Sequence, residues 1–236
     1  MKNENDVFGN AIADYYVSPN STKIIVKSPD FEDDEIPVSY LFRSFNEMLE
    51  IEQRALQLCN GKTLDVGCGA GAHSLYLQQQ NIPVSAIDTS PKAIETCKLQ
   101  GLKNAEVKDF FKLKKQKYNT LLFLMNGIGI VGKLENMHSF FNQLKLLLKA
   151  KGQVLLDSSD LIYLYEGTEE DAKNSPFYYG EIQYQIQYKQ FKSTEFDWLY
   201  IDFNSLAFFA ELHGFSAEKI WDGPHYEYLA KLTLQA

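Results

Sequence analysis

The 236-residue sequence predicts an α/β protein whose core is a mostly parallel sheet covered by helices on both faces, a doubly wound arrangement. Between residues 62 and 157, five short apolar segments alternate with helical patterns, which is typical of a parallel sheet. Segment 118–125 is nearly continuous in apolar residues, as expected of a strand buried on both faces. With 45% hydrophobic residues, the chain is long enough to bury a full core.

Apolar periodicity and capping residues predict where the individual helices and strands lie. Ser90 is a favoured N-cap, Pro91 suits the first helical position, and Gly101 suits the position after a helix. A helix at 204–213 and two final strands joined by a turn at 222–225 complete the domain with an antiparallel C-terminal strand. The seven expected strands cover 62–66, 83–87, 104–108, 118–125, 153–157, 217–221 and 226–235, and the earlier helices cover 45–59, 72–80, 91–100 and 134–149.

Two further segments break this alternation and predict an inserted β-hairpin with one aromatic face. Segment 181–188 alternates strictly between polar and apolar residues, segment 195–201 alternates aromatic residues with others, and the turn "KQFKST" joins them. We therefore expect an irregular or partly helical N-terminal cap at 1–44 and a main domain at 45–236, with an insert at about 161–201.

Charge and cysteine content narrow the possible partners. The formal net charge is −8, and the one basic run, at 112–117, reads as a solvated turn, so we expect no nucleic-acid partner. The three cysteines form no CxxC motif, so we expect neither a disulfide framework nor a metal site. The start lacks a secretory pattern and no apolar run approaches membrane length, so we expect no membrane partner and a reducing, cytoplasmic location.

Three glycines between a strand and a helix predict a ligand site. Gly67, Gly69 and Gly71 allow a sharp turn, let a ligand approach the backbone, and precede the free N–H groups of a helix N-terminus. Asp88 ends the next strand about 20 residues on, where a carboxylate can accept both hydroxyls of a ribose. The pattern predicts a nucleoside-containing cofactor.

The glycine pattern also fits a dinucleotide site, because residues 67–72 satisfy G-x-G-x-x-A. Asp65, just before the first glycine, would repel a pyrophosphate and attract a ligand that carries an amino group. Asp109 and Phe110 after the third strand offer a polar contact and an apolar face for an adenine. These features favour a cofactor other than a dinucleotide.

At this point the sequence resembles the class I S-adenosylmethionine-dependent methyltransferases, over roughly residues 45–236. "LDVGCGAG", "AIDTSPKAI" and "VKDFF" resemble their first three motifs, and "NTLLFLMNGIGIVG" and "LLLKAKGQVLLDSSD" resemble their fourth and fifth strands. The resemblance implies a Rossmann-like fold with S-adenosyl-L-methionine as the cofactor. Residues 150–152 replace the usual Pro-Gly turn, and residues 125–127 replace the Asn-Pro-Pro box of enzymes that act on base or glutamine nitrogens, which disfavours those substrates.

The resemblance also implies roles for individual residues. Asp65 would serve the methionine amino end, and the glycine loop would pass under the methionine and ribose. Asp88 would hold the ribose hydroxyls. Thr89, Asp109 and Phe110 would meet the adenine, and the Met125 backbone would lie near the sulfonium. The cofactor-binding set is therefore Asp65, Gly67, Cys68, Gly69, Ala70, Gly71, Asp88, Thr89, Asp109, Phe110 and Met125.

The catalytic residues and the acceptor atom are not identified by the sequence. A sulfonium is already an activated methyl donor, so SN2 transfer needs mainly an aligned nucleophile in a dry site, and a general base only when that nucleophile carries a proton. His225, Arg43, Asn126 and Tyr163 are the candidates. We expect a small-molecule acceptor and a monomer or homodimer.

Two structural hypotheses and two functional alternatives remain open. The aromatic hairpin would roof the acceptor site together with the cap that carries Tyr40 and Arg43, or it would form a dimer interface. The functional alternatives are a methyltransferase-like protein that binds a ligand or partner without catalysis, and an NAD(P)-dependent oxidoreductase.

Overall fold

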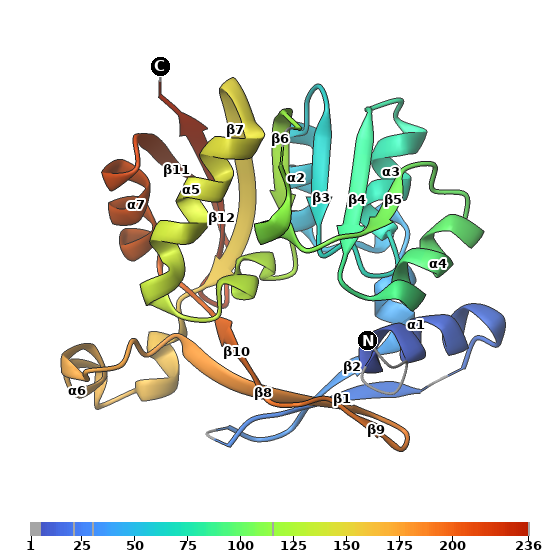
Figure 1. Cartoon of the computed structure of the whole chain (residues 1–236). Coiled ribbons are helices and arrows are strands. Elements are labelled where there is room, and N and C mark those ends of the chain that lie inside the picture. Colours follow the sequence, from blue (N-terminus) through green and yellow to red (C-terminus); the bar gives the residue numbers. More distant parts are fainter. Residues whose placement is uncertain (1–5, 21, 30, 115, 236) are drawn as a thin grey trace. The chain divides into compact units, whose positions relative to one another are not determined.

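A computed structural model describes residues 6–20, 22–29, 31–114 and 116–235 (Figure 1). The chain divides into two compact units, which are described separately. The first comprises Met1–Leu49, Lys62–Lys112 and Gln183–Phe196, and the second comprises Glu50–Gly61, Leu113–Ile182 and Asp197–Ala236.

The predicted seven-stranded α/β sheet is confirmed, with the strand order β11-β12-β7-β6-β3-β4-β5. In the first unit β3, β4 and β5 pair in parallel, and in the second unit β6 and β7 do the same. Strand β12 runs antiparallel to both β7 and β11, so it is the reversed strand expected near the C-terminus. The bounds are β3 (Thr63–Val66), β4 (Val84–Asp88), β5 (Ala105–Val107), β6 (Tyr118–Phe123), β7 (Leu148–Ser159), β11 (Phe215–Asp222) and β12 (Glu227–Leu234).

Helices α3 (Ala72–Gln79) and α4 (Pro91–Leu99) of the first unit begin where the sequence predicts. The Ser90 hydroxyl accepts a hydrogen bond from the Ala93 N–H at 3.0 Å, and Pro91 occupies the first turn. Gly101 follows the helix with a φ of +91°, a conformation that glycine adopts without steric cost. Local signals therefore define α4 at both ends.

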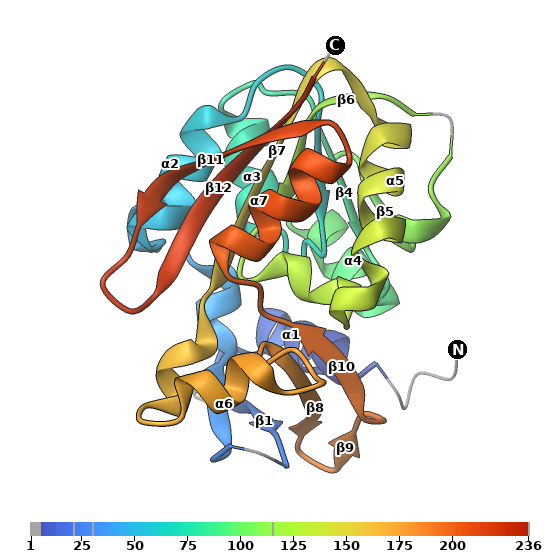
Figure 2. The ribbon, with the colours of Figure 1, turned by 90° about the vertical axis from the view of Figure 1, so that its left-hand side faces the viewer.

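Helices of the second unit are shorter than predicted. The expected helix at 45–59 is a 3₁₀ turn, η3 (Phe45–Glu47) of the first unit, followed by α2 (Glu50–Leu58). The expected helix at 134–149 is η6 (Leu134–Asn136) followed by α5 (Met137–Leu147), because Leu148 already pairs with Tyr118 at the start of β7. Figure 2 shows α2 on one side of the β11–β12 pair and α7 (Phe203–Leu212) on the other.

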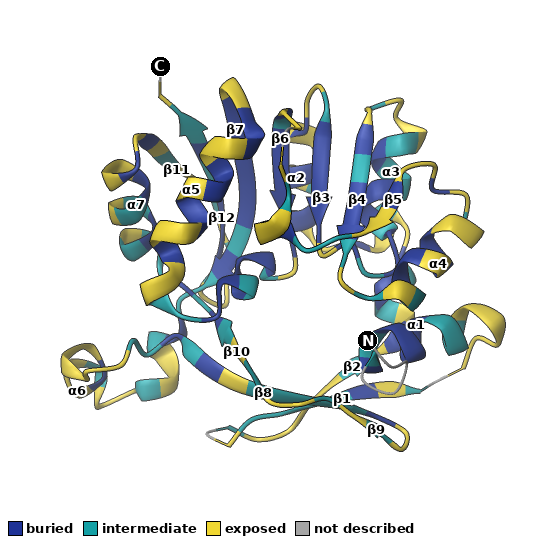
Figure 3. Cartoon of the chain, viewed as in Figure 1, coloured by how far each residue is buried: buried dark blue, intermediate teal, exposed yellow. Residues whose placement is uncertain are grey.

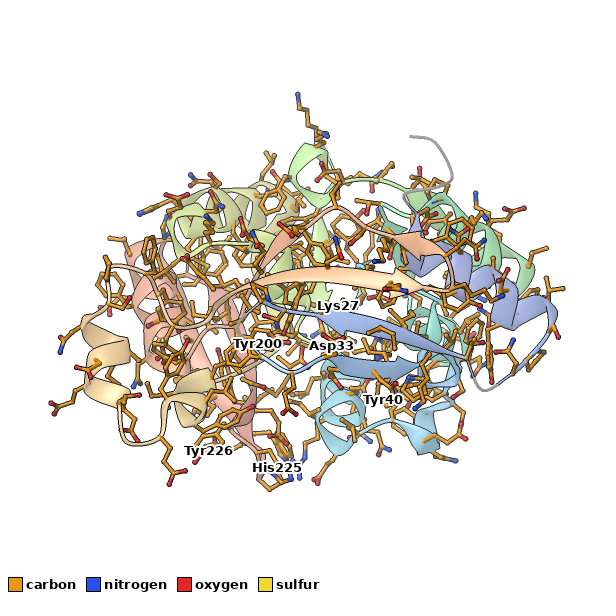
Figure 4. All side chains as sticks on the ribbon, turned by 90° about the horizontal axis from the view of Figure 1, so that it is seen from below. Lys27, Asp33, Tyr40, Tyr200, His225 and Tyr226 are labelled. Atoms are coloured by element: carbon orange, nitrogen blue, oxygen red, sulfur yellow. The ribbon has the colours of Figure 1, made fainter. Side chains whose placement is uncertain are left out.

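The N-terminal cap is more regular than expected. It contains α1 (Val7–Val17), β1 (Lys23–Lys27), β2 (Asp34–Pro37) and the 3₁₀ turn η2 (Val38–Phe42). Strand β1 pairs antiparallel with β2 and with β8 (Glu181–Tyr188), and an ion pair of 3.5 Å joins Lys27 to Asp33 near the β1–β2 connection (Figure 4). The sequence did not reveal these strands, because they are only five and four residues long and the second partner of β1, strand β8, lies more than 150 residues away.

The inserted hairpin is tighter than predicted. Strand β8 turns back at Lys189, whose φ is +52°, and Phe191 and Lys192 form β9 on the end of β8, so the expected six-residue turn is wrong. Strand β10 (Phe196–Leu199) then takes the position next to β8 in the order β10-β8-β1-β2. The segment before β8 holds η7 (Leu161–Tyr165) and α6 (Glu169–Asn174).

One apolar core in the first unit joins the N-terminal segment, the insert and the glycine loop. Tyr188 of β8 is almost fully buried in it, beside Ala70 of the loop and Ala93 of α4. Figure 3 shows most residues of β1 and α1 as buried or intermediate, whereas the α6 region is largely exposed. The remaining members are Val7, Ala11, Ile12, Ile24, Val38 and Leu41.

Replacing Tyr188 with alanine tests this shared core. Removing a buried aromatic ring leaves a cavity, so Tyr188→Ala should lower the free energy of unfolding by about 3–5 kcal/mol in urea titrations. Gln185→Ala, on the opposite face of the same strand, should change it by no more than about 0.5 kcal/mol. Equal effects of the two substitutions would show that Tyr188 is not a core residue.

Candidate functional site

The glycine loop leaves β3 as a sharp turn with open space beside it. Gly67, Gly69 and Gly71 have φ values of +72°, +53° and +87°. A Cβ atom at Gly67 or Gly69 would meet no other described residue within 4 Å, whereas a Cβ at Gly71 would lie 2.9 Å from the Cys97 sulfur. Gly71 is therefore required for packing, and the other two leave the backbone accessible to a ligand.

Asp88, the last residue of β4, holds this loop. One carboxylate oxygen accepts the Gly69 N–H at 2.9 Å, and the other accepts the Ser90 N–H at 2.8 Å. Burial raises the pKa of Asp88 and the nearby Asp6 adds to this, while the backbone N–H donors oppose it. Each oxygen retains a lone pair for a further donor, so the carboxylate is oriented without being saturated.

Asp65 lies beneath the loop, inside the protein. Its carboxylate is 2% exposed and accepts the Ser74 hydroxyl at 2.7 Å. Burial raises the pKa of Asp65, against the opposing effects of His73 and of the Ser74 hydrogen bond. The side chain therefore acts on the loop region from a low-dielectric position, where its charge has a longer reach than at the surface.

Cys68 and Cys97 pack together below the same loop. Their sulfurs lie 4.0 Å apart, and the Cys97 thiol donates to the Gly69 carbonyl at 3.2 Å. The contact with Cys97 and burial both raise the pKa of the Cys68 thiol well above its usual value. Such a thiol is rarely ionised at neutral pH, which makes Cys68 a packing residue and a poor nucleophile.

The predicted adenine contacts lie at the end of β5 in the same unit. The Asp109 carboxylate accepts the Phe111 N–H at 2.9 Å and forms an ion pair with Lys112 at 3.0 Å. Phe110 is buried, while Phe111 is half-exposed and meets it edge-on. Thr89, between Asp88 and Ser90, is exposed.

The candidate Arg43 also belongs to the first unit. Its guanidinium lies 3.8 Å from the centre of the Tyr40 ring and donates to the Tyr40 carbonyl. Arg43 is almost fully buried, so it is a cation held against the face of the Tyr40 ring.

Met125 and Asn126 stand after β6 in the second unit, both in the left-handed region at φ +59° and +53°. The Asn126 N–H donates to Asp157 at 2.9 Å. Its side-chain amide donates to the Leu199 carbonyl at 3.1 Å and accepts the Ser158 hydroxyl at 2.8 Å. Two adjacent non-glycine residues with positive φ store strain, and Asn126 pins this turn to β7 and to β10.

Within the second unit, the segment after β10 is held by two hydroxyl groups whose contacts with it the sequence did not predict. Ser158 accepts the Ile201 N–H at 3.0 Å, and the Tyr228 hydroxyl donates to the Ile201 carbonyl at 2.6 Å. Burial raises the pKa of Tyr228 well above its usual value. No short motif marks these residues, because each bonds to a backbone group more than 25 positions away.

Exposed tyrosines gather at the carboxyl end of β7. The ring of Tyr163 stacks on that of Tyr226 at 4.8 Å, and the two residues are 42% and 56% exposed. Tyr226 has a φ of +66°, and its carbonyl accepts the Asp160 N–H at 3.0 Å. Figure 4 shows His225 beside Tyr226 on the turn that joins β11 to β12; His225 is exposed, and its N–H donates to Glu227 at 2.8 Å.

Within residues 6–235, apart from 21, 30 and 115, no three His, Cys, Asp or Glu side chains form a group that could hold a metal ion. In the same part of the chain, no helix is both long and apolar enough to span a membrane.

The structure places all predicted cofactor residues except Met125 in the first unit, around the ends of β3, β4 and β5. Of the four catalytic candidates, Arg43 lies in the first unit, and Asn126, Tyr163 and His225 lie in the second. Tyr226 is a further aromatic residue of the second unit that sequence reasoning missed.

Comparisons with known proteins agree with this geometry. A protein-family model described as a methyltransferase domain matches residues 59–205. The crystal structure of an S-adenosylmethionine-dependent methyltransferase from Bacteroides fragilis, in complex with S-adenosyl-L-homocysteine, is 46% identical, covers 100% of this chain and 98% of its own, and has a TM-score of 0.91.

More distant matches show the fold. An S-adenosylmethionine-dependent methyltransferase from Clostridium acetobutylicum is 13% identical, covers 77% of this chain and 87% of its own, and has a TM-score of 0.58. A ubiquinone biosynthesis O-methyltransferase from Xylella fastidiosa is 36% identical over 62 residues, which span 26% of this chain and only 25% of that enzyme. The chain belongs to the S-adenosylmethionine-dependent methyltransferases, with S-adenosylmethionine as its cofactor.

Proposed function

We propose that the protein transfers the methyl group of S-adenosylmethionine to a small-molecule acceptor. The observation that carries this proposal is the glycine loop, which has open space beside Gly67 and Gly69 and is held from one side by the oriented Asp88 carboxylate. The Bacteroides fragilis enzyme supports it, because a protein 46% identical over the whole chain binds the product form of the same cofactor.

The residues of the first unit fit this cofactor. Asp88 retains acceptor capacity for the ribose hydroxyls, and the backbone at Gly67 and Gly69 is bare where the methionine and ribose would pass. Asp65 supplies a buried negative charge for the methionine amino group, acting directly or through water. Asp109 and Phe110 with Thr89 are the proposed adenine contacts, and the Met125 backbone is the proposed contact near the sulfonium.

The bound cofactor supplies an activated methyl group, so the main task of the chain's own residues is to position the acceptor and to exclude water from the site. Alignment of two reactants can contribute about 7–11 kcal/mol to lowering a barrier. Asn126 uses both ends of its amide to hold the turn after β6, which makes it a positioning residue in our proposal. Arg43, Tyr163 and His225 are the candidates for direct contact with the acceptor, and a base is needed only if the acceptor atom carries a proton.

The acceptor is proposed to be a small molecule rather than a nucleic acid. The net charge of −8 disfavours a polyanion, and residues 125–127 lack the Asn-Pro-Pro box. The exposed ring pair of Tyr163 and Tyr226 offers an apolar surface at the carboxyl end of β7, the edge at which ligands bind in such sheets. Relatives of the same fold include an amino pentose methyltransferase from Micromonospora echinaspora and a sugar N-methyltransferase from Streptoalloteichus.

The protein is proposed to work in the reducing cytoplasm and to be a monomer or a homodimer. The three cysteines, all free, support a reducing compartment. We also propose that the aromatic hairpin of the insert roofs the acceptor site together with the N-terminal cap. The pairing of β8 with β1 supports this, because the aromatic strand and the cap share one sheet.

A product assay tests the proposed function. The purified protein, given methyl-labelled S-adenosylmethionine, should release S-adenosylhomocysteine and label an acceptor in the dialysable fraction of a cell extract. RNA, DNA and the protein fraction should give no more label than a sample without enzyme. Labelling of a nucleic acid alone would overturn the proposal of a small-molecule acceptor.

Replacing Asp88 tests the cofactor site. A hydrogen bond to a charged group contributes about 1.5–3 kcal/mol, so Asp88→Ala should weaken S-adenosylhomocysteine binding about ten- to a hundredfold in calorimetry. Glu106→Ala, which removes an exposed carboxylate of β5 paired with Lys108, should leave the affinity unchanged. Unaltered affinity of a folded Asp88→Ala protein would contradict the assignment.

Replacing Tyr163 tests the aromatic surface. In our proposal the acceptor packs against the Tyr163 ring, and loss of one aromatic contact costs about 0.5–1.5 kcal/mol. Tyr163→Leu should therefore lower kcat/KM for the acceptor about two- to tenfold while S-adenosylhomocysteine affinity stays constant. Phe177→Leu, at a 74% exposed position of the same insert, is the matched control and should retain normal kcat/KM. If both variants turn over the acceptor normally, the ring pair does not contact it.

A further inference from the structure

A single carboxylate caps two helices in the first unit. One oxygen of Asp6 accepts the Gly9 N–H at 3.0 Å, which caps α1. The other oxygen accepts the Ser90 hydroxyl at 2.9 Å and the Lys92 N–H at 3.2 Å, which lie at the start of α4. A capping aspartate ordinarily serves its own helix, so Asp6 joins two elements that are more than 80 residues apart.

Ser90 continues this connection to the proposed cofactor carboxylate. Its N–H donates to Asp88 at 2.8 Å, and the other Asp88 oxygen accepts the Gly69 N–H at 2.9 Å. Ser90 links two sets of hydrogen bonds, because its N–H donates to Asp88 and its hydroxyl donates to Asp6. A continuous path therefore runs from Gly69 through Asp88, Ser90 and Asp6 to Gly9. The glycine loop and the first turn of α1 are held by the same set of bonds.

Close packing accompanies the hydrogen bonds. Val7, Ala11 and Ile12 of α1 are buried in the same core as Ala70 of the glycine loop and Ala93 of α4. Lys92 also reaches back from α4 to the Asn10 side chain. The contact between α1 and α4 is therefore closely packed.

Gly9 lies at the closest approach of α1 to Ser90. A Cβ atom at Gly9 would lie 2.2 Å from the Ser90 hydroxyl oxygen and 2.4 Å from an Asp6 oxygen. Alanine is a better helix former than glycine, so only the contact with Ser90 and Asp6 disfavours a side chain there.

We propose that α1 is a clasp for the cofactor site, in which Asp6 is a positioning residue that acts through Ser90 to hold Asp88 in its binding orientation. The proposal rests on the assignment of Asp88 to the cofactor ribose. Because coupling between two sites is reciprocal, docking of α1 raises cofactor affinity and bound cofactor holds α1 in place.

Two substitutions separate the clasp from the general stability of α1. Asp6→Asn keeps an oxygen that can cap Gly9 but loses the charge and the second acceptor oxygen that serves Ser90 and Lys92. Gly9→Ala inserts a methyl group against Ser90 without changing any charge. Asp14→Asn is the control, because Asp14 lies at the far end of the same helix and pairs with Lys189 and Tyr188.

Calorimetry with S-adenosylhomocysteine provides the first readout, with circular dichroism to confirm folding. Asp6→Asn loses charge-assisted hydrogen bonds, and Gly9→Ala overpacks the contact with Ser90. Each variant should bind S-adenosylhomocysteine roughly five- to fiftyfold more weakly. The control should bind as the unaltered protein does. Amide exchange should also slow at Gly9 and Asn10 when S-adenosylhomocysteine is added to the unaltered protein.

The pH dependence of binding provides a readout that a merely structural contact would not move. Binding needs ionised Asp88, so affinity should fall as the pH drops through its pKa, which burial and Asp6 raise above 3.8. In Asp6→Asn the contribution of Asp6 is absent, so the fall should begin at a lower pH. Asp6 and Cys68 are the titratable groups that interact electrostatically with Asp88, and Lys92 is held on the Asn10 side chain at the α1–α4 contact.

The outcomes distinguish the clasp from the cofactor assignment. Normal affinity and an unshifted pH profile in folded Asp6→Asn and Gly9→Ala, with Asp88→Ala still impaired, would overturn the clasp alone. Normal affinity in Asp88→Ala as well would overturn the assignment on which it rests. A loss of affinity in Asp14→Asn equal to that in the two test variants would assign the effect to helix stability and also overturn the clasp.

Discussion

The hydrogen bonds of the Asp88 carboxylate are the constraint on which the rest of the first unit depends. The Gly67 and Cys68 N–H groups of the glycine loop donate to the Ile87 carbonyl, but the Gly69 N–H would be a free donor without the Asp88 carboxylate. The same carboxylate binds the Ser90 N–H immediately before α4. One side chain therefore fixes the loop after β3 and the entry to α4, and it does so at the position where a ribose would be held.

A comparable constraint in the second unit is the strained turn at Met125 and Asn126. Its left-handed backbone is maintained because the Asn126 amide and N–H find partners on Ser158, Leu199 and Asp157. The same Ser158 holds Ile201, and Tyr228 holds it from the other side of the residue. The end of the insert is thus an integral part of this unit and is not a detachable hairpin.

The candidate site could be predicted from sequence where its residues are close together in the chain. The glycines at 67–71, the strand-ending Asp88 and the cap at Ser90 each carry a local pattern with a physical meaning. The carboxylate of Asp6, the hydroxyl of Tyr228 and the exposed ring of Tyr226 carry none. Each acts through a partner between 27 and 84 positions away, and the left-handed backbone of Tyr226 gives no signal in the sequence.

The sequence by itself determined the alternation of strands and helices, the seven-stranded sheet with its reversed β12, and the cofactor family, because all three depend on short-range periodicity and on motifs of a few residues. Only the tertiary structure decided that β1 and β8 share a sheet, that β9 folds back on β8 after a two-residue turn, and that α5 ends where β7 begins. Strands of two to five residues have little preference of their own. Their conformation is set by partner strands that supply the missing hydrogen bonds. For β1 these partners are the nearby β2 on one side and β8, more than 150 residues away, on the other.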